Sequence, residues 1–166
     1  MSIKLGIDKK GQLVEVNFEE SNNICIVGNV HSDMMELAVK IKEQFNGKVE
    51  WLKSENISND ILGDIDEKGD LVIFEDAENI KNTEVLEKVL DHPVKTIIIT
   101  EKFDEETIPD SILGKVDIFC VGYIRSIPNY ATQRLKLDKS TMYLNRGEFI
   151  VSRENHKERK ISMDYA

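Results

Sequence analysis

The 166-residue sequence has little cysteine and no long apolar run, and each shortage excludes a class of protein. Its two cysteines, Cys25 and Cys120, both lie in apolar runs, which indicates core residues of a reducing compartment and not a disulfide framework. No apolar run reaches the roughly 20 residues that a membrane-spanning helix needs. We therefore expect a cytoplasmic protein with no direct membrane contact, although it would also fit the cytoplasmic end of a membrane-anchored protein.

Basic residues are outnumbered by acidic ones, 22 to 31, which gives a formal net charge of −9. A general binder of nucleic-acid backbones needs a basic surface, so we expect no nucleic-acid partner. The charge is uneven, because residues 1–121 carry a net −13 and residues 122–166 a net +4. Two interpretations stay open: ordinary variation of a solvated surface, or two faces that contact different neighbours.

Apolar residues make up 40% of the chain, and a chain of this length buries about 70% of its unfolded surface. No repeat or low-complexity linker interrupts it, so we expect a single domain over residues 1–166. Continuous apolar runs are typical of strands that are covered on both faces. Such runs predict buried strands at residues 24–28, 71–74, 96–100 and 116–121.

Amphipathic stripes alternate with these runs and predict helices. The helices are expected over 34–45, capped by Ser32 or Asp33, from Thr83 to before Pro93, from Pro109, and over 129–135. Further strands are expected at 49–52 and in a hairpin over 2–17, and at 142–144, 149–151 and 160–162, with a tight turn at 145–147. Together, the expected strands and helices predict an α/β fold with a mostly parallel sheet, helices on both faces and hairpins at both ends.

The loop after the first buried run stands where a phosphate-binding loop would stand, between a strand and a helix. Such a loop reads G-x-x-x-x-G-K-[ST], and Gly28 occupies its first glycine. Asp33 replaces the second glycine, Met34 the lysine that meets the phosphates, and Met35 the hydroxyl that binds Mg²⁺. The acid also places a negative charge where backbone N–H groups would surround a phosphate.

Two other polar positions are expected at the same edge of the sheet. Glu75 and Asp76 close a buried run in the form of a Walker B strand, although a working site usually has Asp first and Glu second. Thr100 ends the next run, where a polar side chain would approach a γ-phosphate. The sequence thus predicts a vestigial nucleotide site made of Gly28, Ser32, Asp33, Met34, Met35, Glu75, Asp76 and Thr100.

Simpler interpretations of these patterns stay open. The loop would also fit an ordinary β–α turn that never held phosphate, and an acidic pair after a buried strand is common. A threonine at the end of a strand is more often a local cap. We expect no bound cofactor, no metal site and no covalent catalysis, because no ligand spacing or nucleophile motif occurs.

The order of these features resembles the C-terminal ATPase domain of FtsK/SpoIIIE-type coupling proteins of type VII secretion, called EssC in Firmicutes. Residues 3–18 are similar to the family's opening hairpin, and residues 22–28 to the strand before its Walker A loop. Residues 121–130 resemble a late strand with its following segment, and residues 142–148 a closing hairpin that lacks its first glycines here. The resemblance covers most of the chain by order and spacing.

This resemblance implies a RecA-like P-loop fold and a degenerate ATPase domain. It implies binding or sorting of secreted proteins, or regulation of neighbouring ATPase domains of the same coupling protein, with homo-oligomers formed by the full-length protein. The lost Walker A residues predict a module that does not hydrolyse ATP.

Two other functions are weighed against this one. A nucleotide-binding protein or weak ATPase would need another cation, such as Lys102, in place of the missing lysine. A DNA translocase would need the basic tail as its surface. The tail's cations are interspersed with acids and are more simply a solvated face: Arg125, Arg134, Lys136, Arg146, Arg153, Lys157, Arg159 and Lys160.

Overall fold

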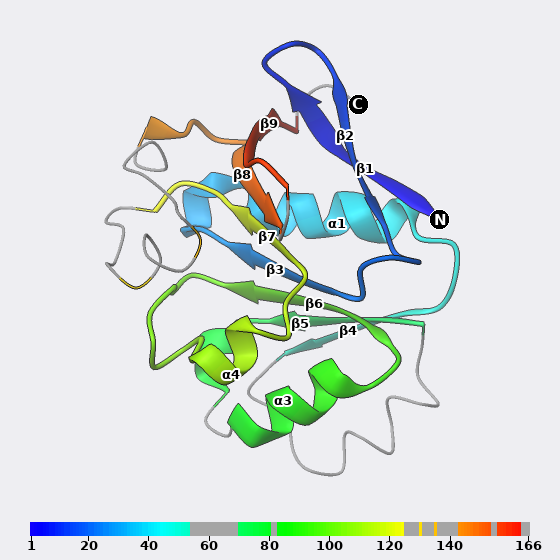
Figure 1. The fold of residues 1–166 in the computed structure, drawn as a ribbon, viewed down its shortest axis with the longest axis vertical. Coiled ribbons are helices and arrows are strands. Elements are labelled where there is room, and N and C mark those ends of the chain that lie inside the picture. Colours follow the sequence, from blue (N-terminus) through cyan, green and yellow to red (C-terminus); the bar gives the residue numbers. More distant parts are fainter. Residues whose placement is uncertain are drawn as a thin grey trace.

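A computed structural model describes residues 1–53, 70–80, 83–124, 130, 135, 143–153 and 156–163. Within these residues the strands form one nine-stranded sheet in the order β2-β1-β9-β8-β7-β3-β6-β5-β4. Figure 1 shows the sheet with α1 on one side and α3 and α4 on the other. The predicted α/β fold with helices on both faces is confirmed.

Five neighbouring strands of the sheet are parallel, in the order β7-β3-β6-β5-β4. Every residue of the central strand β3 is buried, as expected for a continuous apolar run. The predicted runs therefore gave the parallel strands to within a few residues. Their bounds are β3 (Asn23–Val27), β4 (Val49–Lys53), β5 (Leu71–Glu75), β6 (Lys95–Thr100) and β7 (Ile118–Val121).

The other four strands extend the sheet in antiparallel fashion from β7. The hairpin predicted over residues 2–17 forms, and its two strands lie at one edge. Between it and β7 lie the two strands from the end of the chain, so both ends of the sequence meet in one sheet. The bounds are β1 (Ser2–Asp8), β2 (Leu13–Asn17), β8 (Glu148–Arg153) and β9 (Arg159–Ser162).

Alternate residues of β3 face two different apolar clusters. Ile24 and Ile26 pack in the cluster that contains the buried face of α1, whereas Cys25 and Val27 pack in the cluster that contains residues of α3 and α4. This alternation follows from the two-residue period of a strand. The helical segments are η1 (Val30–Ser32), α1 (Met34–Gln44), η3 (Ala77–Asn79), α3 (Thr83–Asp91) and α4 (Asp110–Leu113). No helix in the described part of the chain has the length and apolar character needed to cross a bilayer.

Some expectations differ from the structure or fall outside it. A strand over 142–144 is wrong where it is described, because Tyr143 and Leu144 are not in a strand. The turn at 145–147 does form: the N–H of Glu148 donates to the carbonyl of Asn145 (3.1 Å), and Gly147 has a φ of 80°. This turn is followed by the strand β8, but Tyr143 and Leu144 before it are not in a strand. The helix expected over 129–135 lies mostly outside the described residues.

The packing of α1 gives a direct test of the core. Leu37 is fully buried on this helix, whereas Val39 on the same helix is 40% exposed. Leu37→Ala should lower the free energy of unfolding by about 3–5 kcal/mol, because it leaves a cavity among packed neighbours. Val39→Ala should change it by less than about 0.5 kcal/mol. Urea denaturation of both variants measures the difference, and equal effects would contradict this placement of α1.

Candidate functional site at the carboxyl edge of the parallel strands

Three strand ends meet around the loop that follows β3. The N–H of Gly28 donates to the carbonyl of Thr100 at the end of β6 (3.2 Å). The N–H of Gly122, just after β7, donates to the carbonyl of Val27 (2.7 Å), and the N–H of Asn29 donates to the carbonyl of Tyr123 (2.9 Å). The structure thus brings the predicted residues Gly28 and Thr100 together at the carboxyl edge, where ligands bind in open α/β sheets.

Four N–H groups of the loop donate to acceptors within the protein. The side-chain oxygen of Asn29 accepts from the N–H of His31 (2.7 Å), and the carbonyl of Asn29 accepts from the N–H of Ser32 (3.0 Å). The hydroxyl of Ser32 donates to the same carbonyl (2.7 Å). In a phosphate-binding loop such N–H groups point at the ligand. Here the N–H groups of residues 28, 29, 31 and 32 are already bonded.

Ser32 fills the space between two glycines. Its side chain is fully buried, and a Cβ added at Gly28 would lie 2.4 Å from the Ser32 Oγ. A Cβ at Gly122 would lie 2.9 Å from the Ser32 Cβ and from an edge carbon of Phe149. Gly122 was not among the predicted site residues. Its signal is a glycine directly after a buried strand, in the same position as Gly28.

The capping expected at the start of α1 is wrong. Asp33 occupies the N-cap position, but its side chain makes no capping hydrogen bond, and the Ser32 hydroxyl bonds to Asn29 instead. Asp33 has φ 65° and ψ 29°, a left-handed conformation that glycine adopts readily and aspartate tolerates. The backbone at the second glycine position therefore keeps a glycine-like conformation without glycine.

A cation does contact this loop, but it comes from the turn before β8. The Arg146 Nε donates to the Asp33 Oδ1 (2.6 Å), and the N–H of Gly147 donates to the carbonyl of Ser32 (3.3 Å). The Arg146 side chain is 74% exposed and the Asp33 side chain 13% exposed. A pair this exposed contributes about 0–1 kcal/mol, so it directs the Asp33 carboxylate more than it stabilises the fold.

The two methionines of the loop pack toward apolar neighbours. Met34 is 5% exposed and belongs to the cluster between α1 and the sheet, and Met35 is half-buried against the same cluster. Residues 34 and 35 are the lysine and hydroxyl positions of a phosphate-binding loop. Their thioethers provide neither a cation for phosphate nor a hard oxygen ligand for Mg²⁺.

The acidic pair lies on the same edge but two strands away from the loop. Since neighbouring strands are about 4.8 Å apart, β5 lies roughly 10 Å from β3 across the sheet. The Glu75 carboxylate accepts from the Trp51 indole N–H (3.0 Å), and Asp76 has a left-handed backbone with φ 57°.

Thr100 is fully buried, and its hydroxyl donates to the carbonyl of Lys102 and accepts from the N–H of Lys102. Thr100 therefore caps its own loop, which is the simpler of the two interpretations above.

The two cysteines are not among the residues of the candidate site. Cys25 and Cys120 are both buried without a disulfide, and they face opposite sides of the sheet. Burial raises the pKa of the Cys120 thiol to about 12 and also raises the pKa of Cys25, so both stay protonated near neutral pH. Among the described residues, no three or more His, Cys, Asp or Glu side chains are grouped to hold a metal ion.

Neither a protein-family model nor a curated protein sequence matches the chain. Solved structures do match it over nearly its whole length. EccC ATPases 2 and 3 from Thermomonospora curvata, in complex with a signal sequence peptide, are 12% identical with a TM-score of 0.63. EssC ATPases 2 and 3 from Geobacillus thermodenitrificans are 10% identical with a TM-score of 0.61. The pCW3 conjugation coupling protein TcpA, with ATPγS, is 10% identical with a TM-score of 0.75.

The matches cover 98–99% of this chain but only part of each solved protein. The chain spans 40% of the EccC and EssC structures and 66% of TcpA. At these identities the likeness concerns the fold. The chain therefore shares its fold with the EccC and EssC ATPases and with the conjugation coupling protein TcpA.

Proposed function

We propose that this chain is a non-hydrolytic ATPase-like module of a type VII secretion coupling protein. It acts in protein export in the cytoplasm, by binding secreted proteins or by regulating neighbouring ATPase domains. The observation that carries the proposal is the closed loop after β3, in which Ser32 fills the space between Gly28 and Gly122. The proposed vestigial nucleotide site consists of Gly28, Ser32, Asp33, Met34, Met35, Glu75, Asp76 and Thr100.

The loop's hydrogen bonds support the loss of nucleotide binding. A phosphate would have to displace N–H groups from acceptors at 2.7–3.0 Å, and each such bond contributes about 0.5–1.5 kcal/mol. It would also meet the Asp33 carboxylate, where a like charge is unfavourable. The missing lysine and hydroxyl remove the groups that would offset these costs.

The solved relatives support protein partners. The EccC structure is a complex with a signal sequence peptide, so a domain of this fold occurs in a protein that binds such a peptide. Two observations favour the nucleotide-binding alternative: the acidic pair Glu75-Asp76 at the same edge and the Arg146 guanidinium beside the loop. That guanidinium contacts the carboxylate of Asp33, which partly neutralises it.

The loop predicts which substitutions restore nucleotide binding. Asp33→Gly, Met34→Lys and Met35→Thr together should produce an ATP-dependent rise in Tm with Mg²⁺, since a ligand at 100 times its Kd adds about 2.7 kcal/mol. Because Met34 is buried, the variant is compared with itself with and without ATP. Asp33→Gly alone is the control and should show no rise. A rise in this control would show that the lost cation is not the obstacle.

The proposed role is tested by capture of secreted proteins. The purified chain, immobilised on beads, should retain at least one secreted protein of its own type VII system without added nucleotide. Retention should be the same with and without Mg-ATP, because the module acts without a nucleotide cycle. Retention that requires ATP would favour the nucleotide-binding alternative, and no retention would contradict a role in binding secreted proteins.

A further inference from the structure

The turn before β8 contacts the loop after β3 at two adjacent residues. The N–H of Gly147 donates to the carbonyl of Ser32 (3.3 Å), and the Arg146 Nε donates to the Asp33 Oδ1 (2.6 Å). Ser32 and Asp33 are the last residues of the loop before α1 begins. The tail of the chain therefore reaches the loop at the point where the loop passes into the helix.

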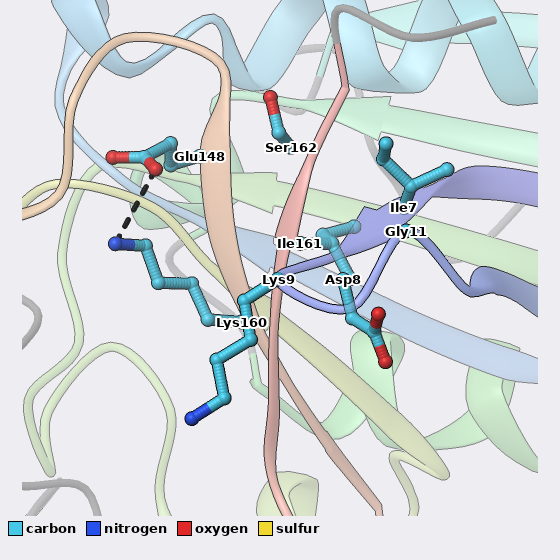
Figure 2. Close-up of a pocket in the computed structure, with 8 residues that line it drawn as sticks. All are labelled: Ile7, Asp8, Lys9, Gly11, Glu148, Lys160, Ile161 and Ser162. Carbon is cyan, nitrogen blue, oxygen red and sulfur yellow. Dashed lines mark ion pairs between the residues drawn. The ribbon is translucent and has the colours of Figure 1, made fainter.

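The turn is held in shape by Glu148. Its N–H donates to the carbonyl of Asn145 (3.1 Å), and one oxygen of its carboxylate accepts from the N–H of Asn145 (2.7 Å). The other carboxylate oxygen pairs with Lys160 on β9 (3.3 Å). Figure 2 shows this ion pair in the lining of a pocket on the antiparallel part of the sheet. The turn is thus closed on itself and joined to β9.

The end of β9 joins this turn to α1. The N–H of Met163, directly after β9, donates to the carbonyl of Gly147 (2.8 Å). The carbonyl of Met163 accepts from the Lys40 Nζ on α1 (3.0 Å), and its side chain packs against the cluster beneath α1. A single residue therefore links the turn to the helix that follows the loop.

The flank of α1 that carries Lys40 is itself fixed to the first hairpin. Gln44 lies four residues after Lys40, so both side chains are on one flank of the helix. The side-chain oxygen of Gln44 accepts from the N–H of Lys4 on β1 (2.8 Å), and its amide nitrogen donates to the carbonyl of Lys4 (2.8 Å). The helix therefore provides a fixed anchor for the end of β9.

These contacts form a ring, and its weakest contacts are those at the loop. From α1 the ring runs through Met163 and Gly147 to Ser32, from which the chain returns to the start of α1. The distance of 3.3 Å between Gly147 and Ser32 is beyond the usual range of about 2.7–3.2 Å. The Arg146 side chain is 74% exposed, so water screens its pair with Asp33. The contacts of Met163 are shorter, and one has a charged donor, which strengthens it.

We propose that the tail acts as a releasable clamp on the loop after β3. The clamp consists of Arg146, Gly147 and Met163, and Lys40 holds it in place. While the clamp is engaged, it fixes the last two residues of the loop. When the end of β9 leaves α1, the loop opens more often. The inference rests on the proposed function in treating this loop as the vestigial site, and it adds regulation of that site by the tail.

The alternative is a loop that stays closed without the tail. The N–H and the hydroxyl of Ser32 both bond to the carbonyl of Asn29, and these bonds lie within the loop. If they are sufficient, loss of the clamp leaves the loop unchanged. The two possibilities differ in how fast the loop amides exchange with solvent, since exchange requires local opening.

The test is amide hydrogen exchange of the 166-residue chain without nucleotide, followed by NMR. Lys40→Met removes the ammonium group that holds the end of β9, and Arg146→Gln removes the ion pair with the loop. With both changes, the N–H groups of Asn29 and Ser32 should exchange roughly tenfold faster, which corresponds to about 1.4 kcal/mol in the free energy of opening. The N–H groups of β3 and β6 should keep their rates, because the opening is confined to the loop.

The matched control is Lys42→Met, which makes the same change on the opposite flank of α1. There the Lys42 ammonium lies 5.8 Å from the centre of the Trp51 ring. This variant should leave loop exchange within about twofold. Unchanged loop exchange in the double variant, an equal rise in Lys42→Met, or a rise that extends equally over β3 and β6 would overturn the clamp.

The clamp and the proposed function can fail separately. ATP binding by the unmodified chain would contradict the function and leave the clamp standing, because exchange is measured without nucleotide. Loss of the clamp without any change in loop exchange would overturn the clamp and leave the function standing, because residues 33–35 would still lack the lysine and the hydroxyl.

Discussion

The fit of Ser32 between Gly28 and Gly122 is the constraint on which the carboxyl edge depends. The two glycines follow neighbouring buried strands, β3 and β7, and neither position has room for a Cβ. The Ser32 hydroxyl and N–H both bond to the carbonyl of Asn29, which closes the loop on itself. A loop closed in this way has the N–H groups of residues 28, 29, 31 and 32 bonded within the protein, which supports the proposal that the edge does not bind nucleotide.

The turn before β8 adds a second contact to the same loop. Arg146 and Gly147 reach Asp33 and Ser32 from more than 110 residues away in the sequence. The tail of the chain therefore contacts the closed loop through its turn and pairs with the first hairpin through β9.

The periodicity of apolar residues predicted those strands and helices whose position depends on local burial. The apolar runs gave β3, β5, β6 and β7, and the stripe from Met34 to Ile41 gave the buried face of α1. Contacts between distant segments could not be predicted, because alternation along one strand does not name its neighbour. The insertion of β9 between β1 and β8, and the contact of Arg146 with Asp33, are of this kind. Comparison with the phosphate-loop motif showed that Met34 stands at the lysine position. It did not point to Gly122, whose close approach to Ser32 is seen only in the structure. The single domain and the site residues remain predictions.

The central claim is that the closed loop does not bind nucleotide, and isothermal titration calorimetry of the unmodified chain tests it most directly. ATP and ADP are titrated in the presence of Mg²⁺ up to millimolar concentration. The account predicts no binding heat beyond dilution, since the N–H groups of residues 28, 29, 31 and 32 are bonded internally and residues 33–35 supply an acid and two thioethers. Saturable binding with a micromolar Kd, about 8 kcal/mol of binding free energy, would contradict it.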